Sequence, residues 1–194
     1  MDLHQISELF QRLSRLTDRA QVKEGAGFQY NVVLMNGSTQ TISIPDMRSF
    51  ESVKDDAVDL ICWIWNSKDY LKKLANQPEF EFINIENAVN RSPELSICAD
   101  LANGLKHGGL DRWQRTVHNP RLGEVGYFVH GEGVGNLAFY ATNIEVSISD
   151  FDEVNVRLPV IDKNSSQLFD VFELCTLAIE QLECLRSRIC VRVV

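Results

Sequence analysis

Apolar residues at helical spacing run through much of the chain and predict four helical segments. Recurrence every three or four positions is typical of a helix that packs one face on a core. The predicted helices cover about 2–22, 49–75, 79–107 and 166–188. Within the third segment, Ser92-Pro93 indicates a helix start, because serine caps the first turn and proline fits there. Gly108-Gly109 is typical of a helix end.

Two further segments alternate at period two and predict β structure. Phe28, Tyr30 and Val32 alternate with polar residues before Asn36-Gly37, and a second strand-like run follows. Asn-Gly between two alternating runs is a strong hairpin signal, so we expect a β-hairpin over 28–44. Short alternating runs separated by turn residues predict a second β insertion over 126–158.

These elements predict a mainly α fold with β insertions, of the α+β class. Four amphipathic helices can bury their apolar faces as an antiparallel bundle. The β segments are too short to form a sandwich of their own. We therefore expect one domain over 1–194, a helical bundle with an N-terminal β-hairpin and a small antiparallel β annex.

The charge and cysteine content narrow the classes of function. The chain has 27 acidic and 19 basic residues, a formal net charge of −8. A negative surface repels phosphate backbones, so RNA stays a candidate partner that the charge does not favour, except through a local basic groove. The five cysteines form no CxxC pair, as in a reduced cytoplasmic protein. The longest apolar run, Leu60 to Trp65, is too short for a membrane span.

One helical stripe in the third segment carries side chains that can take part in acid–base chemistry. Asp100, Asn103 and His107 are spaced i, i+3, i+7 and so fall on one predicted helix face. A carboxylate, an amide and an imidazole in one row can orient each other and transfer protons. The structural alternative is that Asp100 and Asn103 are ordinary polar positions and that His107 interacts with the helix dipole.

The same stripe resembles a motif of known proteins. The pattern D-x-A-N-x-x-K-H, from Asp100 to His107, looks like one in bacterial helical proteins whose bundle is similar to the HEPN fold. The resemblance covers about residues 50–185. It implies a helical bundle and, in the HEPN ribonucleases, an arginine and a histidine separated by four to six residues at a dimer interface, where the pair cleaves RNA.

The implied arginine–histidine pair does not fall on the stripe. The positions that the arginine would occupy before His107 hold Asp100, Leu101 and Ala102, none of which is basic, whereas Arg112 and His118 have the required spacing. These two residues follow a glycine pair in irregular sequence. In a chain with twelve arginines and four histidines, a pair with this spacing occurs by chance about as often as it is absent.

Other site chemistries have weaker support in the sequence. His107, His118, His130 and Asp100 have no metal-ligand spacing, and we expect no metal and no cofactor. We therefore predict a non-catalytic binding or assembly module with a protein partner or a homodimer contact, for which the final helix offers Phe169, Phe172 and Leu182. The alternative is a HEPN-like ribonuclease or related hydrolase that uses His107 or His118 with a nearby arginine.

Overall fold

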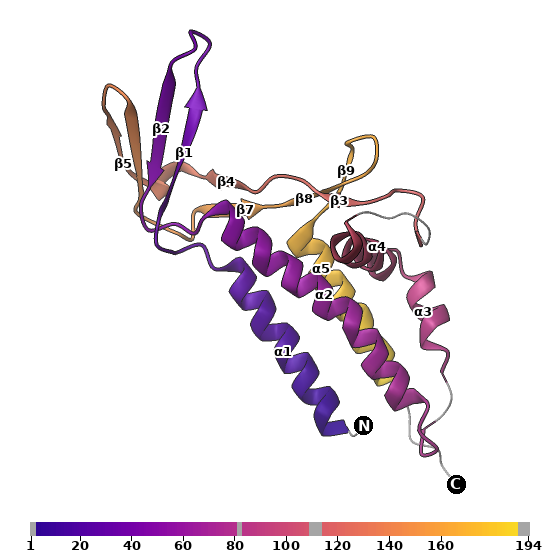
Figure 1. The fold of residues 1–194 in the computed structure, drawn as a ribbon. Helices are drawn as coiled ribbons and strands as arrows, with labels where there is room; N and C mark the ends of the chain where they lie inside the picture. The colour runs from indigo at the N-terminus through magenta and orange to yellow at the C-terminus, as the bar shows by residue number, and fades with distance from the viewer. Residues whose placement is uncertain (1–2, 81–82, 109–113, 190–194) are drawn as a thin grey trace. The chain divides into compact units, whose positions relative to one another are not determined.

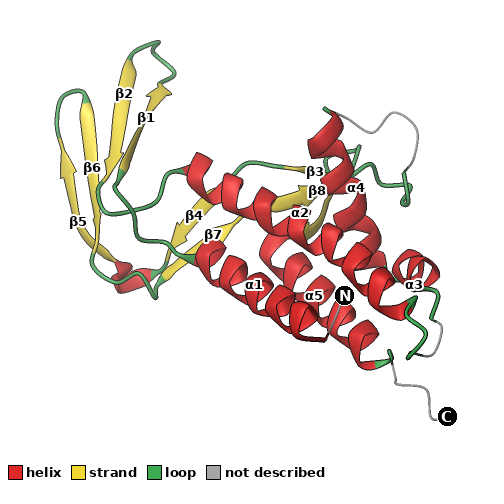
Figure 2. Cartoon of the chain, turned by 60° about the horizontal axis from the view of Figure 1, so that its bottom comes forward, coloured by secondary structure: helices red, strands yellow, loops and turns green. Residues whose placement is uncertain are grey.

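The computed structural model describes residues 3–80, 83–108 and 114–189. It is a mixed fold of helices and small sheets (Figures 1 and 2). The chain forms two compact units. The first contains Met1–Ala20, Asp56–Gly123 and Leu158–Val194, and the second contains Gln21–Asp55 and Glu124–Arg157. The two predicted β insertions therefore lie almost entirely in the second unit, although they are far apart in the sequence.

The described residues form five α-helices, and most of their bounds follow the apolar periodicity. They are α1 (Leu3–Gln21), α2 (Phe50–Ala75), α3 (Ile85–Arg91), α4 (Pro93–His107) and α5 (Val171–Ser187). The segment expected as helix over 79–107 contains two helices that meet at Ser92. The Ser92 hydroxyl accepts from the Leu95 amide at 3.2 Å, and Gly108 ends α4 with a left-handed φ of 70°, so both sequence signals are confirmed.

The final helix begins later than the sequence predicts. Gln167–Asp170 is a strand, β9, and α5 begins only at Val171, because the Asp170 carboxylate caps the helix by accepting from the Phe172 amide at 2.9 Å. β9 pairs with β8 (Pro159–Ile161), which also pairs with β3 (Arg121–Leu122). The expected helix over 166–188 is therefore wrong in its first turn.

The core of the first unit is built from the apolar stripes of its helices. α4 is enclosed along half its length, since every residue from Leu95 to Ala102 is buried. α1 and α2 run antiparallel in both ribbon views. The largest fully buried side chains of these elements include Ile6, Leu13, Leu60, Ile61, Ile64, Leu71, Leu101 and Leu174. Within the described residues, no helix has the length and apolarity required to cross a bilayer.

The second unit is β structure. Its four-stranded sheet has the order β1-β2-β6-β5. The strands are β1 (Phe28–Val33), β2 (Thr39–Ile44), β5 (Val134–Phe139) and β6 (Asn143–Ile148). β1 pairs antiparallel with β2, β5 antiparallel with β6, and the two hairpins join through the parallel pair β2–β6. A separate ribbon pairs β4 (Gly126–Val129) with β7 (Val154–Arg157), and the short helix η1 (Gly131–Gly133) leads into β5.

An aromatic cluster packs on one end of the four-stranded sheet. The Phe50 ring lies 4.7 Å from that of Phe28 and 5.5 Å from that of Tyr127, measured between centroids. The Tyr127 hydroxyl donates to the Arg48 carbonyl oxygen at 2.8 Å. Burial raises the pKa of Tyr127 to about 12, although the charge of Arg48 acts in the opposite direction.

This burial predicts a late step in the alkaline titration of the protein. We expect an absorbance titration of tyrosinate to contain a component near pH 12 that belongs to Tyr127. Tyr127→Phe should remove that component and leave the rest of the curve in place. An identical curve for the variant would show that the Tyr127 hydroxyl is not buried against Arg48.

Candidate functional site

Asp100 lies at the centre of the first unit and is fully buried in α4. Its carboxylate accepts three hydrogen bonds of 2.8 Å, from the amides of Arg115 and Thr116 and from the Thr116 hydroxyl. A buried carboxylate is stable only when donors replace water. These three donors do so, and they hold the segment after α4 against the helix. Asp100 is thus engaged as a structural anchor.

The three residues of the predicted stripe lie in different environments. Asp100 is buried, Asn103 is half-buried, and His107 is exposed in the last turn of α4. Asn103 lines a hollow of about 370 Å³ together with Asn90, Gln114 and Arg115. The enclosure of α4 ends after Ala102, so the shared helix face passes from the interior to the surface over two turns. The stripe does not form one acid–base centre.

The other predicted site residues are also dispersed. Arg112 lies outside the described residues. His118 is half-buried, and its carbonyl oxygen accepts from the Lys163 amide at 2.9 Å. Among the described residues, no three histidine, cysteine or acidic side chains gather as metal ligands.

An ionic cluster beside the Asp100 anchor was not predicted from the sequence. Glu86 of α3 accepts from the Arg115 guanidinium at 2.6 Å and from the Lys72 ammonium at 3.4 Å. The Lys68 ammonium lies 3.5 Å from the same carboxylate and 3.9 Å from the Trp65 ring centroid. The four charged residues come from α2, α3 and the segment after α4, so no local spacing could have indicated them.

Arg115 connects this cluster to the anchor. Its backbone amide bonds to Asp100, and its guanidinium bonds to Glu86 and Asn90 and lies 4.7 Å from the Trp65 ring centroid. Burial disfavours the charged form of Glu86, but the Arg115 hydrogen bond and the neighbouring cations outweigh it and hold its pKa below the ordinary value. The three cations of this cluster interact with Glu86, and two of them also with the Trp65 ring, which is typical of a structural network.

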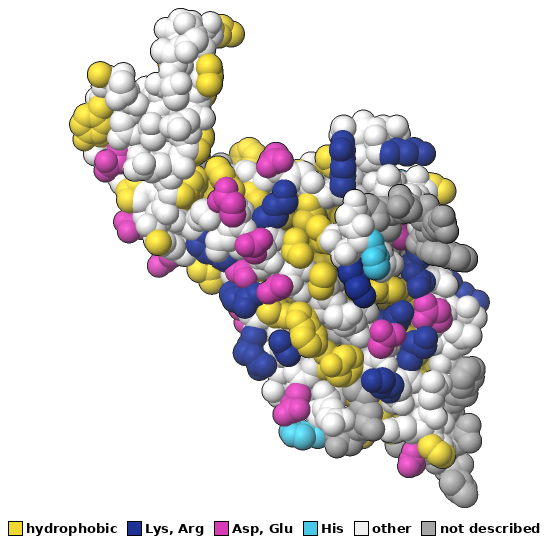
Figure 3. Space-filling model, in the orientation of Figure 1, with side chains coloured by type: hydrophobic (Ala, Val, Ile, Leu, Met, Phe, Trp, Pro, Cys, Tyr) yellow, Lys and Arg dark blue, Asp and Glu magenta, His cyan; other side chains and the backbone are white. Residues whose placement is uncertain are grey.

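The four-stranded sheet of the second unit has one polar and one apolar face. Directly paired residues share a face, and the row Tyr30–Ile42–Ile144–Phe139 crosses all four strands. On the apolar face Phe139 is 69% exposed, Leu137 46% and Tyr30 37%. Figure 3 shows hydrophobic side chains on the surface of these strands. Apolar side chains that gather on an exposed face mark interaction surfaces.

This sheet is also almost free of charge. Glu145 is the single charged residue in 28–44 and 133–149, and its strand position places it on the polar face, opposite Ser43 and Ala138. β1 and β5 are the outer strands, each paired on one side only. Soluble proteins usually protect such edges with charges or proline. These two edges have neither, so they can accept another strand.

Comparison with known proteins gives no assignment. No protein-family model matches the chain, and no curated protein and no solved structure is significantly similar to it.

The Asp100 anchor predicts a large loss of stability on truncation. Asp100→Ala leaves two buried amides without an acceptor, so we expect a loss of about 3 kcal/mol in the free energy of unfolding. Thr116→Val removes one of the three bonds and should cost about 1 kcal/mol. Urea denaturation measures both, with Asp69→Ala at an exposed position as control. Equal stabilities of Asp100→Ala and the control would contradict the anchor.

The ionic cluster predicts a pH-dependent contribution from Glu86. A folded-state pKa below the unfolded value stabilises the protein above the unfolded pKa, and this contribution disappears as pH falls through the folded pKa. Glu86→Gln should therefore be less stable than wild type at pH 7, and the difference should shrink below about pH 4.5. Urea denaturation at several pH values measures this difference. A difference that grows toward low pH would have the wrong sign.

Proposed function

We propose that this protein is a non-catalytic assembly module that binds a second copy of itself through the four-stranded sheet. The observation that carries the proposal is the exposed apolar face of that sheet, which lacks charged side chains. Burial of apolar surface is the main favourable term in protein association. Charges, which oppose it, are depleted at interface cores.

The size of the face is consistent with the centre of a dimer interface. Val134 is 40% exposed beside the more exposed Leu137 and Phe139. With side chains of about 200 Å² each, the exposed parts of these residues and Tyr30 offer on the order of 400 Å² of apolar surface. A standard interface buries about 800 Å² per partner, with an apolar centre and a polar rim.

Charge indicates where on the surface a second copy can bind. Each chain has a formal charge of −8, so two copies repel one another over most of their surfaces. The sheet is a region where two copies can meet with almost no like-charge contact. A two-fold axis beside β5 would pair this outer strand, which carries Phe139, with its own copy, and two-fold symmetry is the common arrangement of dimers.

The final helix offers less for such a contact than its sequence suggests. On α5, Leu182 is fully buried and Phe172 is half-buried, whereas Phe169 is half-buried and lies in β9, outside the helix. The apolar stripe of α5 thus serves the core of its own chain to a large extent. We infer that the helices form an antiparallel bundle whose role is that of a scaffold, which the antiparallel course of α1 and α2 supports.

The alternative, a HEPN-like ribonuclease, has less support among the described residues. Its histidine candidates are an exposed His107 and a half-buried His118. Arg115, three residues before His118, is engaged by Glu86 and Asn90. For these reasons the assembly function is our conclusion.

The assembly proposal predicts a dimer that a single charge on the apolar face weakens. Sedimentation equilibrium should show a monomer–dimer equilibrium with a dissociation constant on the order of 10 µM. Phe139→Lys should weaken it at least about tenfold, because two desolvated ammonium groups would face one another. Gln29→Lys adds the same charge on the polar face of an outer strand and is the matched control.

Two outcomes would overturn the proposal. The first is a wild-type protein that stays monomeric well above about 100 µM. The second is a dimer that Phe139→Lys and Gln29→Lys affect equally, since the contact would then lie elsewhere. Circular dichroism of both variants verifies that the fold is retained.

A further inference from the structure

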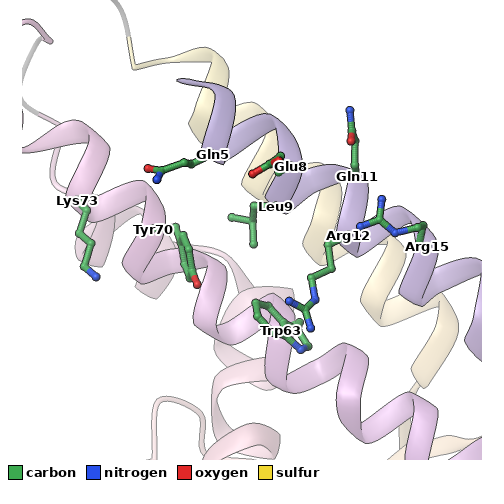
Figure 4. A pocket seen from close by; sticks show the side chains of 9 residues that line it. All are labelled: Gln5, Glu8, Leu9, Gln11, Arg12, Arg15, Trp63, Tyr70 and Lys73. Atoms are coloured by element: carbon green, nitrogen blue, oxygen red, sulfur yellow. The ribbon is translucent and has the colours of Figure 1, made fainter. Parts of the chain in front are cut away.

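A groove of about 780 Å³ lies between α1 and α2 in the first unit. Figure 4 shows its lining side chains, in which Tyr70 and Leu9 lie between Lys73 on one side and Arg12 and Trp63 on the other. A volume of this size is in the range of small-molecule sites. The lining residues are Gln5, Glu8, Leu9, Gln11, Arg12, Arg15, Trp63, Tyr70 and Lys73.

The groove has a local excess of positive charge on a negatively charged protein. The groove is lined by three positively charged side chains, Arg12, Arg15 and Lys73, and by one acidic side chain, Glu8. One helical turn further along α1, Arg19 is paired with acidic residues of α2. Among the described residues, no ion pair is formed by the three groove cations. An anion would therefore find donors in the groove that are not already neutralised.

The groove also contains aromatic surface. Trp63 and Tyr70 are half-buried, so part of each ring remains accessible. The Arg12 guanidinium lies 3.6 Å from the Trp63 ring centroid, a cation–π contact that orients the guanidinium at this end of the groove. Leu9 lies between this stack and Tyr70 and is 4% exposed, so the accessible aromatic surface is that of the two rings. Flat aromatic rings such as nucleobases stack favourably on aromatic side chains, and this stacking depends little on which base is stacked.

The length of the groove limits the ligand. Trp63 and Lys73 are ten residues apart on one helix, which corresponds to about 15 Å along its axis. A planar ring joined to a phosphate through a sugar has dimensions on this order. A phosphate at the arginine end would meet two guanidinium groups, whose planar donors match phosphate oxygens.

We propose that the groove between α1 and α2 is a binding site for a nucleoside phosphate. The ring stacks on Tyr70, while Arg12 and Arg15 bind the phosphate. Lys73 adds positive charge at the other end. This site is independent of the proposed assembly function, since its residues belong to the first unit and the apolar sheet to the second.

Calorimetric titration with adenosine monophosphate tests the site. We expect binding with a dissociation constant on the order of 100 µM at low salt. Adenosine lacks the phosphate and inorganic phosphate lacks the ring, so each should bind at least about tenfold more weakly. Tryptophan fluorescence should change on binding of the nucleotide, because Trp63 lines the groove.

Variants of the exposed Arg15 and the half-buried Tyr70 locate the site. Arg15→Gln should weaken nucleotide binding about tenfold, and Tyr70→Leu about fivefold through loss of stacking. Lys163→Gln removes an exposed positive charge outside the groove and should change the affinity less than about twofold. Phe139→Lys should bind the nucleotide as wild type does, which separates this test from that of the dimer.

Several results would overturn the proposal. They are an absence of nucleotide binding at roughly millimolar concentration, equal affinities for the nucleotide and inorganic phosphate, and equal effects of Arg15→Gln and Lys163→Gln. Retained nucleotide affinity in both Arg15→Gln and Tyr70→Leu would place any binding elsewhere on the protein.

Discussion

The carboxylate of Asp100 has no access to water, and the first unit is organised around the donors that satisfy it. A buried charge without partners would cost several kcal/mol, so the segment after α4 must lie where its amides reach the carboxylate. Once Arg115 is placed by its backbone, its guanidinium reaches Glu86 of α3, and Glu86 in turn attracts cations of α2. One buried group thereby connects a loop and three helices.

The same constraint explains why the chemically suggestive residues of α4 do not act together. A helix face is a continuous row of side chains, but its surroundings change along the axis. Asp100 lies where α4 is enclosed, and His107 lies in the last turn, beyond the enclosed part. Proton transfer between side chains requires a common space, and the row from Asp100 to His107 has none.

The two units present different kinds of surface for binding. The sheet of the second unit is neutral and apolar, which suits a protein surface of similar character, whereas the groove of the first unit combines cations with aromatic rings, which suits a small aromatic anion. Both features depart from the acidic character of the chain as a whole. An average charge describes long-range repulsion and leaves such local departures unspecified.

Local patterns in the sequence determined most of the secondary structure. The periodicity of α1 and α2, the capping signals of α4 and the alternation of β1 and β2 each depend on residues close together in the chain, where propensity and capping act. The final helix begins later than its predicted start at 166, because β9 pairs with β8 and Asp170 caps the helix after that strand. Tertiary structure alone decided the burial of Asp100, the cluster at Glu86, the union of two distant hairpins in one sheet, and the groove between α1 and α2. Each of these joins residues from separate elements, and their proximity depends on how the elements pack rather than on their spacing in the sequence.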